Sequence, residues 1–118
     1  VFGANSFADY TTLVLGVPDY TWSVASSASE FGYTVEGLDI IQLFKDNGSL
    51  CNAAGGSDTV GACWYKFITS DQEIANSITA NHLAGKDTTV KFMAESGASN
   101  TQTAGDYQAT ITFTAVAN

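Results

Sequence analysis

The 118-residue chain carries 12 acidic residues and only 4 basic ones, which gives it a formal net charge of −8 at neutral pH. This balance nearly excludes nucleic-acid binding, because phosphate contacts require clustered Lys and Arg side chains. With one His and two Cys, the chain lacks the reagents of most metal and nucleophilic chemistry, and no apolar run approaches the ~18 residues of a membrane helix.

The length predicts one domain over residues 1–118, large enough for a core of its own. The chain begins with Val1 instead of Met, which indicates a processed or excised N-terminus. Residues 1–8 are apolar or small and precede the first charge. We expect this segment either to pair as a donor strand with the open sheet edge of another copy, or to be the frayed first strand of its own sheet. The candidate anchors in the subunit interface are Phe2, Phe7, Leu13 and Leu15.

Apolar and polar residues alternate along most of the chain, which is typical of half-buried strands. The predicted strands cover residues 8–17, 20–24, 31–36, 38–44, 60–68, 88–94 and 107–115. The last two could pair as neighbours. Seven to eight short strands at this spacing predict an all-β fold, an antiparallel β-sandwich of the immunoglobulin-like or jelly-roll type.

One segment departs from this alternation. Ser70 and Glu73 form a capping box, and the apolar residues Ile74 and Ile78 follow at a spacing near that of a helix. The pattern predicts one short helix over residues 70–78, and the alternative is a loop with one short strand.

Two cysteines, Cys51 and Cys63, flank a flexible loop over residues 52–62. An even number of Cys in an acidic chain without Arg favours a disulfide over two buried thiols. Closing such a loop stabilises a fold by roughly 3 kcal/mol in the chain-entropy model. Disulfides persist in oxidising compartments, so the pair predicts a secreted or cell-surface protein.

Asn47 begins an Asn-Gly-Ser sequon for glycosylation. The preceding Asp makes the same stretch strong turn chemistry, which is the preferred interpretation. Oxygen ligands for calcium are present at Asp46, Asn47 and Asp58, but without the spacing of a regular calcium loop. A zinc site is not expected, because two Cys and a distant His82 do not supply four ligands. No metal or cofactor is therefore predicted.

An enzyme is not predicted. His82 is the only imidazole, and the Gly-x-Ser-x-Gly context of a nucleophilic serine is absent. Most acidic residues sit in turn sequences, which explain them better than a pair of glycosidase carboxylates does. Glu36 and Asp39, beside apolar strands, are the least easily dismissed.

Aromatic residues offer the main alternative to a purely structural role. Flat rings can stack on sugars, but aromatic residues inside alternating strands fill a core more often. The candidates are Tyr10, Tyr20, Trp22, Trp64 and Tyr65. Lys91 with Asn118 is the one pair that could form an intramolecular isopeptide bond, although no carboxylate is obviously placed beside them.

The last predicted strand has a recognisable sequence. Residues 104–113 read Ala-Gly-Asp-Tyr-Gln-Ala-Thr-Ile-Thr-Phe. This pattern resembles the final strand of bacterial surface β-sandwiches, namely pilins, spore-coat-type fibre subunits and WxL-type cell-wall domains. Repeat domains of bacterial cell-surface proteins are similar at residues 30–35, 46–48, 51–52 and 63–64. The chain lacks a second WxL-like motif near its end, and its Cys residues lie closer together than those of chaperone-assembled pilins. The resemblance implies no binding residue.

These observations predict an extracellular structural protein, a subunit of a surface fibre, pilus or coat that assembles with copies of itself by strand donation. Only 14% of the residues are charged, so the strand edges lack their usual protection against pairing. Head-to-tail donation does not close and therefore makes filaments. The alternative is a carbohydrate-binding or adhesin module of a cell-surface protein, with surface glycans as partners.

Overall fold

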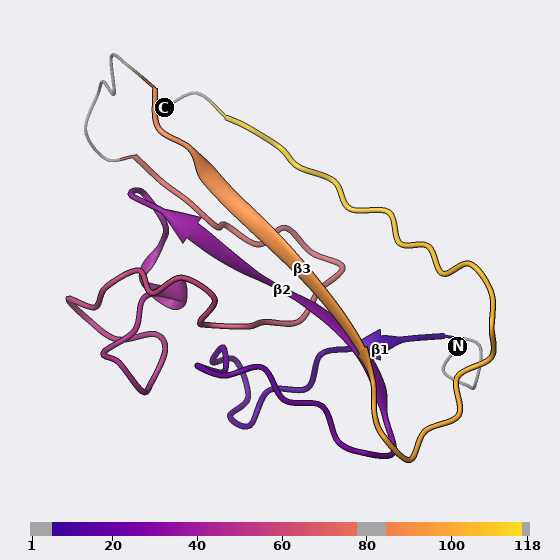
Figure 1. The fold of residues 1–118 in the computed structure, drawn as a ribbon. Coiled ribbons are helices and arrows are strands. Elements are labelled where there is room, and N and C mark those ends of the chain that lie inside the picture. The colour runs from indigo at the N-terminus through magenta and orange to yellow at the C-terminus, as the bar shows by residue number, and fades with distance from the viewer. Residues whose placement is uncertain (1–5, 78–84, 117–118) are drawn as a thin grey trace.

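Figure 1 shows the computed structural model, which describes residues 6–77 and 85–116 of the chain. The regular structure of these residues is almost entirely sheet. Its elements are β1 (Ala8–Asp9), β2 (Ser29–Gly37), the single-turn 3-10 helix η1 (Gln42–Phe44) and β3 (Thr88–Ser96). The strands form one sheet in the order β1-β2-β3, with β1 parallel and β3 antiparallel to β2.

The long β2–β3 pair is the centre of the fold. Its register sets Tyr33 opposite Phe92 and Val35 opposite Val90. Because side chains alternate along a strand, these apolar residues lie on one face of the sheet. Tyr33 and Val35 are buried, with 5% and 1% of their surface exposed, whereas β3 is exposed along nearly all of its length.

Gly32 allows β2 to approach its neighbours closely. A Cβ atom at this position would lie 2.6 Å from the carbonyl oxygen of Tyr65 and 2.8 Å from the Cβ of Tyr10. Only glycine fits so close an approach. The backbones of Tyr33 and Tyr65 can therefore exchange hydrogen bonds with N–O distances of 3.0 and 2.8 Å.

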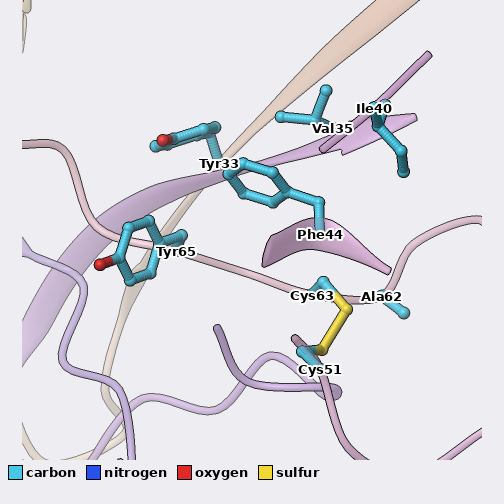
Figure 2. Close-up of a cluster of buried hydrophobic side chains, with 8 residues drawn as sticks. All are labelled: Tyr33, Val35, Ile40, Phe44, Cys51, Ala62, Cys63 and Tyr65. Carbon is cyan, nitrogen blue, oxygen red and sulfur yellow. A yellow bond between two sulfur atoms is a disulfide. The ribbon is translucent and has the colours of Figure 1, made fainter. Parts of the chain in front are cut away.

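The core packs around η1 and the disulfide (Figure 2). Phe44 is 1% exposed, and its ring centroid lies 5.7 Å from that of Tyr33 and 6.2 Å from that of Tyr65. Cys51 and Cys63 form a disulfide, which confirms the predicted pairing. Burial, with a smaller contribution from Tyr65, raises the pKa of Tyr33 to about 12.

Two of the predicted strands, 31–36 and 88–94, are confirmed within β2 and β3. The prediction for residues 8–17 holds only at β1. The remaining predicted strands form isolated bridges, η1 or irregular chain at residues 20–24, 38–44, 60–68 and 107–115. The last two predicted strands do not pair with each other in the structure, since no backbone hydrogen bond or bridge joins residues 107–115 to β3. The described residues form a single sheet, and its β1–β2 pair is parallel, so the antiparallel sandwich of seven to eight strands stays a prediction.

The helix predicted over residues 70–78 is wrong for its described part, because residues 70–77 are not helical. Ala75 instead forms an isolated bridge with Ile40, and Ile74 packs against the core. Pairing with the core loop satisfies backbone groups that a helix would have satisfied internally. The apolar spacing of this segment therefore comes from residues that pack against the core from non-helical chain, and not from one face of a helix.

Candidate functional site

β3 lies at one side of the sheet, and its outer edge is open. No backbone hydrogen bond or bridge joins this edge to any other described residue. Apart from the half-buried Val90, every β3 residue is exposed, including Phe92 by 52%. Phe92 stacks on Phe67 with ring centroids 6.0 Å apart, so the apolar face of the sheet ends at a ring that nothing further covers in the described chain. An edge of this kind is a template for another strand.

The edge of β2 that faces away from β3 is already hydrogen-bonded to other segments of the chain. The Tyr10 amide donates a hydrogen bond of 2.9 Å to the carbonyl of Phe31, just after β1. Further along, Tyr33 and Tyr65 form a bridge. The outer edge of β3 is therefore the one strand-length open edge in the part of the chain that the structure describes.

Residues 107–116, called here the C-terminal segment, are extended but unpaired. The segment forms most of the yellow trace in Figure 1, and no backbone hydrogen bond joins it to another described residue. Phe113 is 61% exposed and Val116 is 80% exposed. The radius of gyration of the Cα atoms is 15.7 Å, against about 13.5 Å for a compact chain of this length. An exposed, extended C-terminal segment is consistent with a radius of gyration larger than that of a compact chain.

The four predicted interface residues do not gather in one place. Phe2 lies outside the described residues. Phe7 packs edge-on against Tyr107, with ring centroids 5.1 Å apart. Leu13 and Leu15 belong to a turn instead of the predicted strand, and they are 90% and 87% exposed. They are available for contact, although not as residues of a paired strand.

Asp19 holds this turn in place. Its carboxylate, on a residue that is 8% exposed, accepts hydrogen bonds of 2.9 Å from the Leu13 amide and from the Tyr10 hydroxyl. Burial is the largest cause that raises the pKa of Tyr10, and the negative charge of Asp19 raises it further. The hydroxyl of Tyr10 is thereby kept protonated as a donor.

The candidate sugar platform is mostly core. Tyr10, Trp64 and Tyr65 are 1%, 5% and 7% exposed. Trp22 stacks on Tyr10 with ring centroids 4.4 Å apart and meets Trp64 edge-on at 5.3 Å. Of the five candidates, Trp22 and Tyr20 are half-buried. The core interpretation therefore holds for three of the five.

Trp22, Tyr20 and Trp64 nevertheless line an open pocket of approximately 340 Å³. The buried Nε1 of Trp22 has no hydrogen-bond partner among the described residues. A buried donor without a partner is unusual in folded proteins. Trp22 is thus both a lining residue of this pocket and the holder of a buried donor without a partner.

Asp46 organises the turns beside the disulfide. It is 1% exposed, and its carboxylate accepts hydrogen bonds from the Gly48 amide at 2.8 Å and from the Thr59 hydroxyl at 3.0 Å. The exposed Asn47 uses its side-chain oxygen to accept a hydrogen bond of 2.9 Å from the Leu50 amide. This geometry is turn chemistry, and glycosylation of Asn47 stays a prediction.

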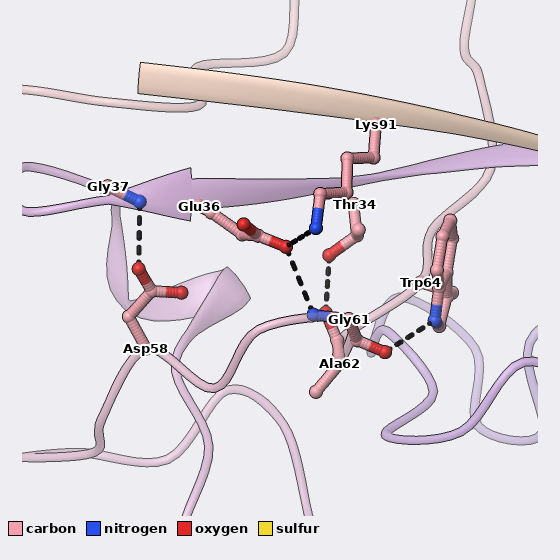
Figure 3. Close-up of polar contacts among 8 residues, drawn as sticks. All are labelled: Thr34, Glu36, Gly37, Asp58, Gly61, Ala62, Trp64 and Lys91. Carbon is pink, nitrogen blue, oxygen red and sulfur yellow. Dashed lines mark hydrogen bonds and ion pairs between the residues drawn. The ribbon is translucent and has the colours of Figure 1, made fainter. Parts of the chain in front are cut away.

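Glu36 joins both long strands to the loop before Cys63 (Figure 3). Its Oε1 lies 2.8 Å from the Lys91 ammonium nitrogen and accepts a hydrogen bond of 3.0 Å from the Gly61 amide. Burial alone would raise the pKa of Glu36, but the hydrogen bonds from Lys91 and Gly61 outweigh burial and lower it. Nearby, Asp58 accepts a hydrogen bond of 2.8 Å from the Gly37 amide. Glu36, one of the two least easily dismissed acidic residues, thus has structural partners. The other, Asp39, accepts a hydrogen bond of 2.8 Å from the Asn76 amide through its backbone carbonyl.

We expect Glu36→Gln to reduce stability at neutral pH by less than about 1 kcal/mol, because the Lys91 partner is partly exposed. The ordinary pKa of Glu36 is 4.5 and the folded protein lowers it. The carboxylate therefore stabilises the fold above pH 4.5, and this contribution is lost as the pH falls through the lowered pKa. In urea unfolding between pH 3 and 7, the free energies of unfolding of the parent and of Glu36→Gln should become equal at the acid end of this range. Glu95→Gln, the same change at an exposed position of β3, is the control and should show no such convergence.

Other candidates contribute less. His82 and Asn118 lie outside the described residues, so the structure does not bear on their predicted roles. Within the described ranges, His, Cys, Asp and Glu form no group of three that could hold a metal ion. The same residues contain no helix with the length and apolar character needed to cross a bilayer.

Comparison with known proteins returns no relative: no family model, curated protein or solved structure matches the chain. The resemblance to bacterial surface β-sandwiches stays a prediction from the sequence. The candidate site consequently rests on geometry alone, with the open edge of β3, the C-terminal segment and the exposed turn at Leu13 and Leu15 as its parts.

Proposed function

We propose that the protein is an extracellular structural subunit that assembles with copies of itself into a surface fibre or coat by strand pairing between subunits. The observation that carries this proposal is the open outer edge of β3, a nine-residue strand exposed along nearly all of its length. An uncovered edge of this length is a template for pairing. Of the two charged residues on β3, Lys91 and Glu95, Lys91 is already paired with Glu36.

The exposed apolar side chains support the same function. Leu13, Leu15 and Phe113 are between 61% and 90% exposed. Exposed apolar groups on a weakly charged surface favour contact between protein molecules. Leu13 and Leu15 are therefore assigned to the subunit interface together with Phe92, and Phe7 is assigned to it through its contact with Tyr107. The Cys51–Cys63 disulfide fits an oxidising, extracellular compartment.

A carbohydrate-binding module is the second candidate, favoured by the pocket of Tyr20, Trp22 and Trp64. Sugar rings stack on aromatic faces, and three aromatic residues line this open pocket. This function needs no assembly, which separates it from the first.

Light scattering of the native protein, with negative-stain imaging of the same sample, tests the first function. We expect particles far heavier than the 12.4 kDa chain that persist in high salt, because apolar and backbone contacts are not screened as ion pairs are. A monomer at all concentrations would contradict assembly. A monomer whose tryptophan fluorescence changes when oligosaccharides are added would favour the second function.

A further inference from the structure

We propose that the C-terminal segment of one copy, residues 107–116, adds a strand to the outer edge of β3 in a neighbouring copy. This inference rests on the proposed function, and it names the two surfaces that meet. It moves the donor from residues 1–8, where the sequence places it, to the other end of the chain. The N-terminal donor is retained as the competing outcome of the test.

The two surfaces have matching backbone requirements. β3 offers nine residues whose outer edge is unpaired among the described residues. The C-terminal segment supplies ten residues, 107–116, in an extended conformation and equally without backbone hydrogen bonds to the described chain. Pairing the two would satisfy both sets of amide and carbonyl groups, which is how an added strand binds a sheet edge.

The side chains match as well. On β3, Val90, Phe92 and Ala94 lie on the face that continues Val35, Tyr33 and Phe31 of β2. In the C-terminal segment, alternate positions are apolar from Tyr107 through Ile111 and Phe113 to Ala115, with Thr or Gln between them. An added strand places its apolar side chains on one face of the sheet. Its apolar face would therefore cover the exposed ring of Phe92.

The chain that follows β3 packs first against the loop that precedes β2. Gly97 donates a backbone hydrogen bond of 2.7 Å to Ala28, and Ser99 donates one of 2.8 Å to Ser26. A Cβ atom on Gly97 would lie 2.3 Å from the Ala25 carbonyl oxygen, so the chain passes directly against the loop that precedes β2. After this turn the chain runs back in the direction opposite to β3 (Figure 1), yet no backbone hydrogen bond joins residues 107–116 to β3.

Further contacts hold the start of the segment near β1. Gln102 donates a hydrogen bond of 3.4 Å to the Ser6 carbonyl, and Tyr107 packs on Phe7. Ser6 and Phe7 lead into β1, which flanks β2 on the side away from β3. Because β1 and the outer edge of β3 lie on opposite sides of the sheet, pairing of the segment with its own β3 would draw Tyr107 away from Phe7. When the segment pairs with a second copy instead, each copy presents a donor on one side and an acceptor on the other, and such head-to-tail contacts generate filaments.

The test compares two single substitutions in the full chain. Phe113→Lys places a charge on the apolar face of the C-terminal segment, and Thr112→Lys places the same charge on its polar face. Both positions are exposed, so neither change removes a buried contact, and near-ultraviolet circular dichroism checks the fold. We expect Phe113→Lys to weaken association by about tenfold or more, because a lysine is poorly accommodated against an apolar surface. Thr112→Lys should assemble nearly as the parent does.

Hydrogen exchange supplies the second readout. In the parent protein, amides of β3 and of the C-terminal segment should become protected together when particles form, and Phe113→Lys should leave both unprotected at the same concentration. If the parent assembles but both variants do so equally, and residues 1–8 become protected instead, the C-terminal donor is overturned while the proposed function stands. If the parent stays monomeric, with β3 protected by its own C-terminal segment, both the inference and the proposed function fail.

Discussion

Replacing Phe44 with Ala is expected to lower the free energy of unfolding by about 3–5 kcal/mol, the usual cost of removing a fully buried aromatic ring. Phe44 is 1% exposed and packs between the rings of Tyr33 and Tyr65. Its ring joins η1 to β2 and to the chain around the disulfide, so no single neighbour can fill the space that the substitution leaves. A loss of this size is a large part of the stability of a typical small domain.

Equilibrium unfolding in urea, followed by tyrosine and tryptophan fluorescence, measures this loss. Leu50→Ala is the matched control, because Leu50 is 67% exposed and its truncation should change stability by no more than about 0.5 kcal/mol. Equal effects of the two substitutions would show that η1 does not belong to the cooperative core. In that case the stable unit would be the sheet alone.

The sequence pattern predicted best where a strand is paired over its whole length. Residues 31–36 and 88–94 alternate clearly, and they form the long β2–β3 pair. The disulfide was also predictable, because two Cys residues leave one intramolecular pairing. The two strands follow from the local alternation of residue types, and the disulfide follows from the number of cysteines. Both properties can be read directly from a sequence.

Alternation failed where the segment is not paired with another strand in the described part of the chain. Residues 107–115 have the clearest alternation of all, yet they pair with no described residue. Residues 8–17 alternate too, but Asp19 draws the Leu13 amide into a turn through its carboxylate. A hydrogen bond to a side chain six residues away is invisible to periodicity, which reports only which face is apolar.

The same limit applies to the candidate site. Leu13 and Leu15 were recognised as apolar and accessible, although they occupy a turn and not a strand. Phe92 was missed, because its position in an alternating strand predicts burial. Its exposure arises only from the strand order, in which β3 has a neighbour on one side. Strand order is a long-range property, and no local signal in this sequence specifies it.

The second large effect is expected at the disulfide. Replacing both Cys51 and Cys63 with Ala should lower the free energy of unfolding by about 2–4 kcal/mol, because the bridge closes a loop whose ends would otherwise separate in the unfolded chain. Cys63 is fully buried, and its φ of 62° is a left-handed conformation. Such a conformation costs an L-residue about 1–2 kcal/mol, and the surrounding contacts must hold it in place.

Urea unfolding of the parent with and without reductant, beside the double variant, separates the bridge from its surroundings. Reductant should destabilise the parent and leave the variant unchanged. The same loop is also held by Asp46, whose backbone exchanges hydrogen bonds of 2.9 and 2.8 Å with Ser57 and whose carboxylate binds Thr59. If reduction leaves the parent's midpoint where it was, the hydrogen bonds of Asp46 hold the loop without the bridge. In that case, Asp46→Ala in the reduced protein should lower the free energy of unfolding by the amount predicted above for removal of the disulfide.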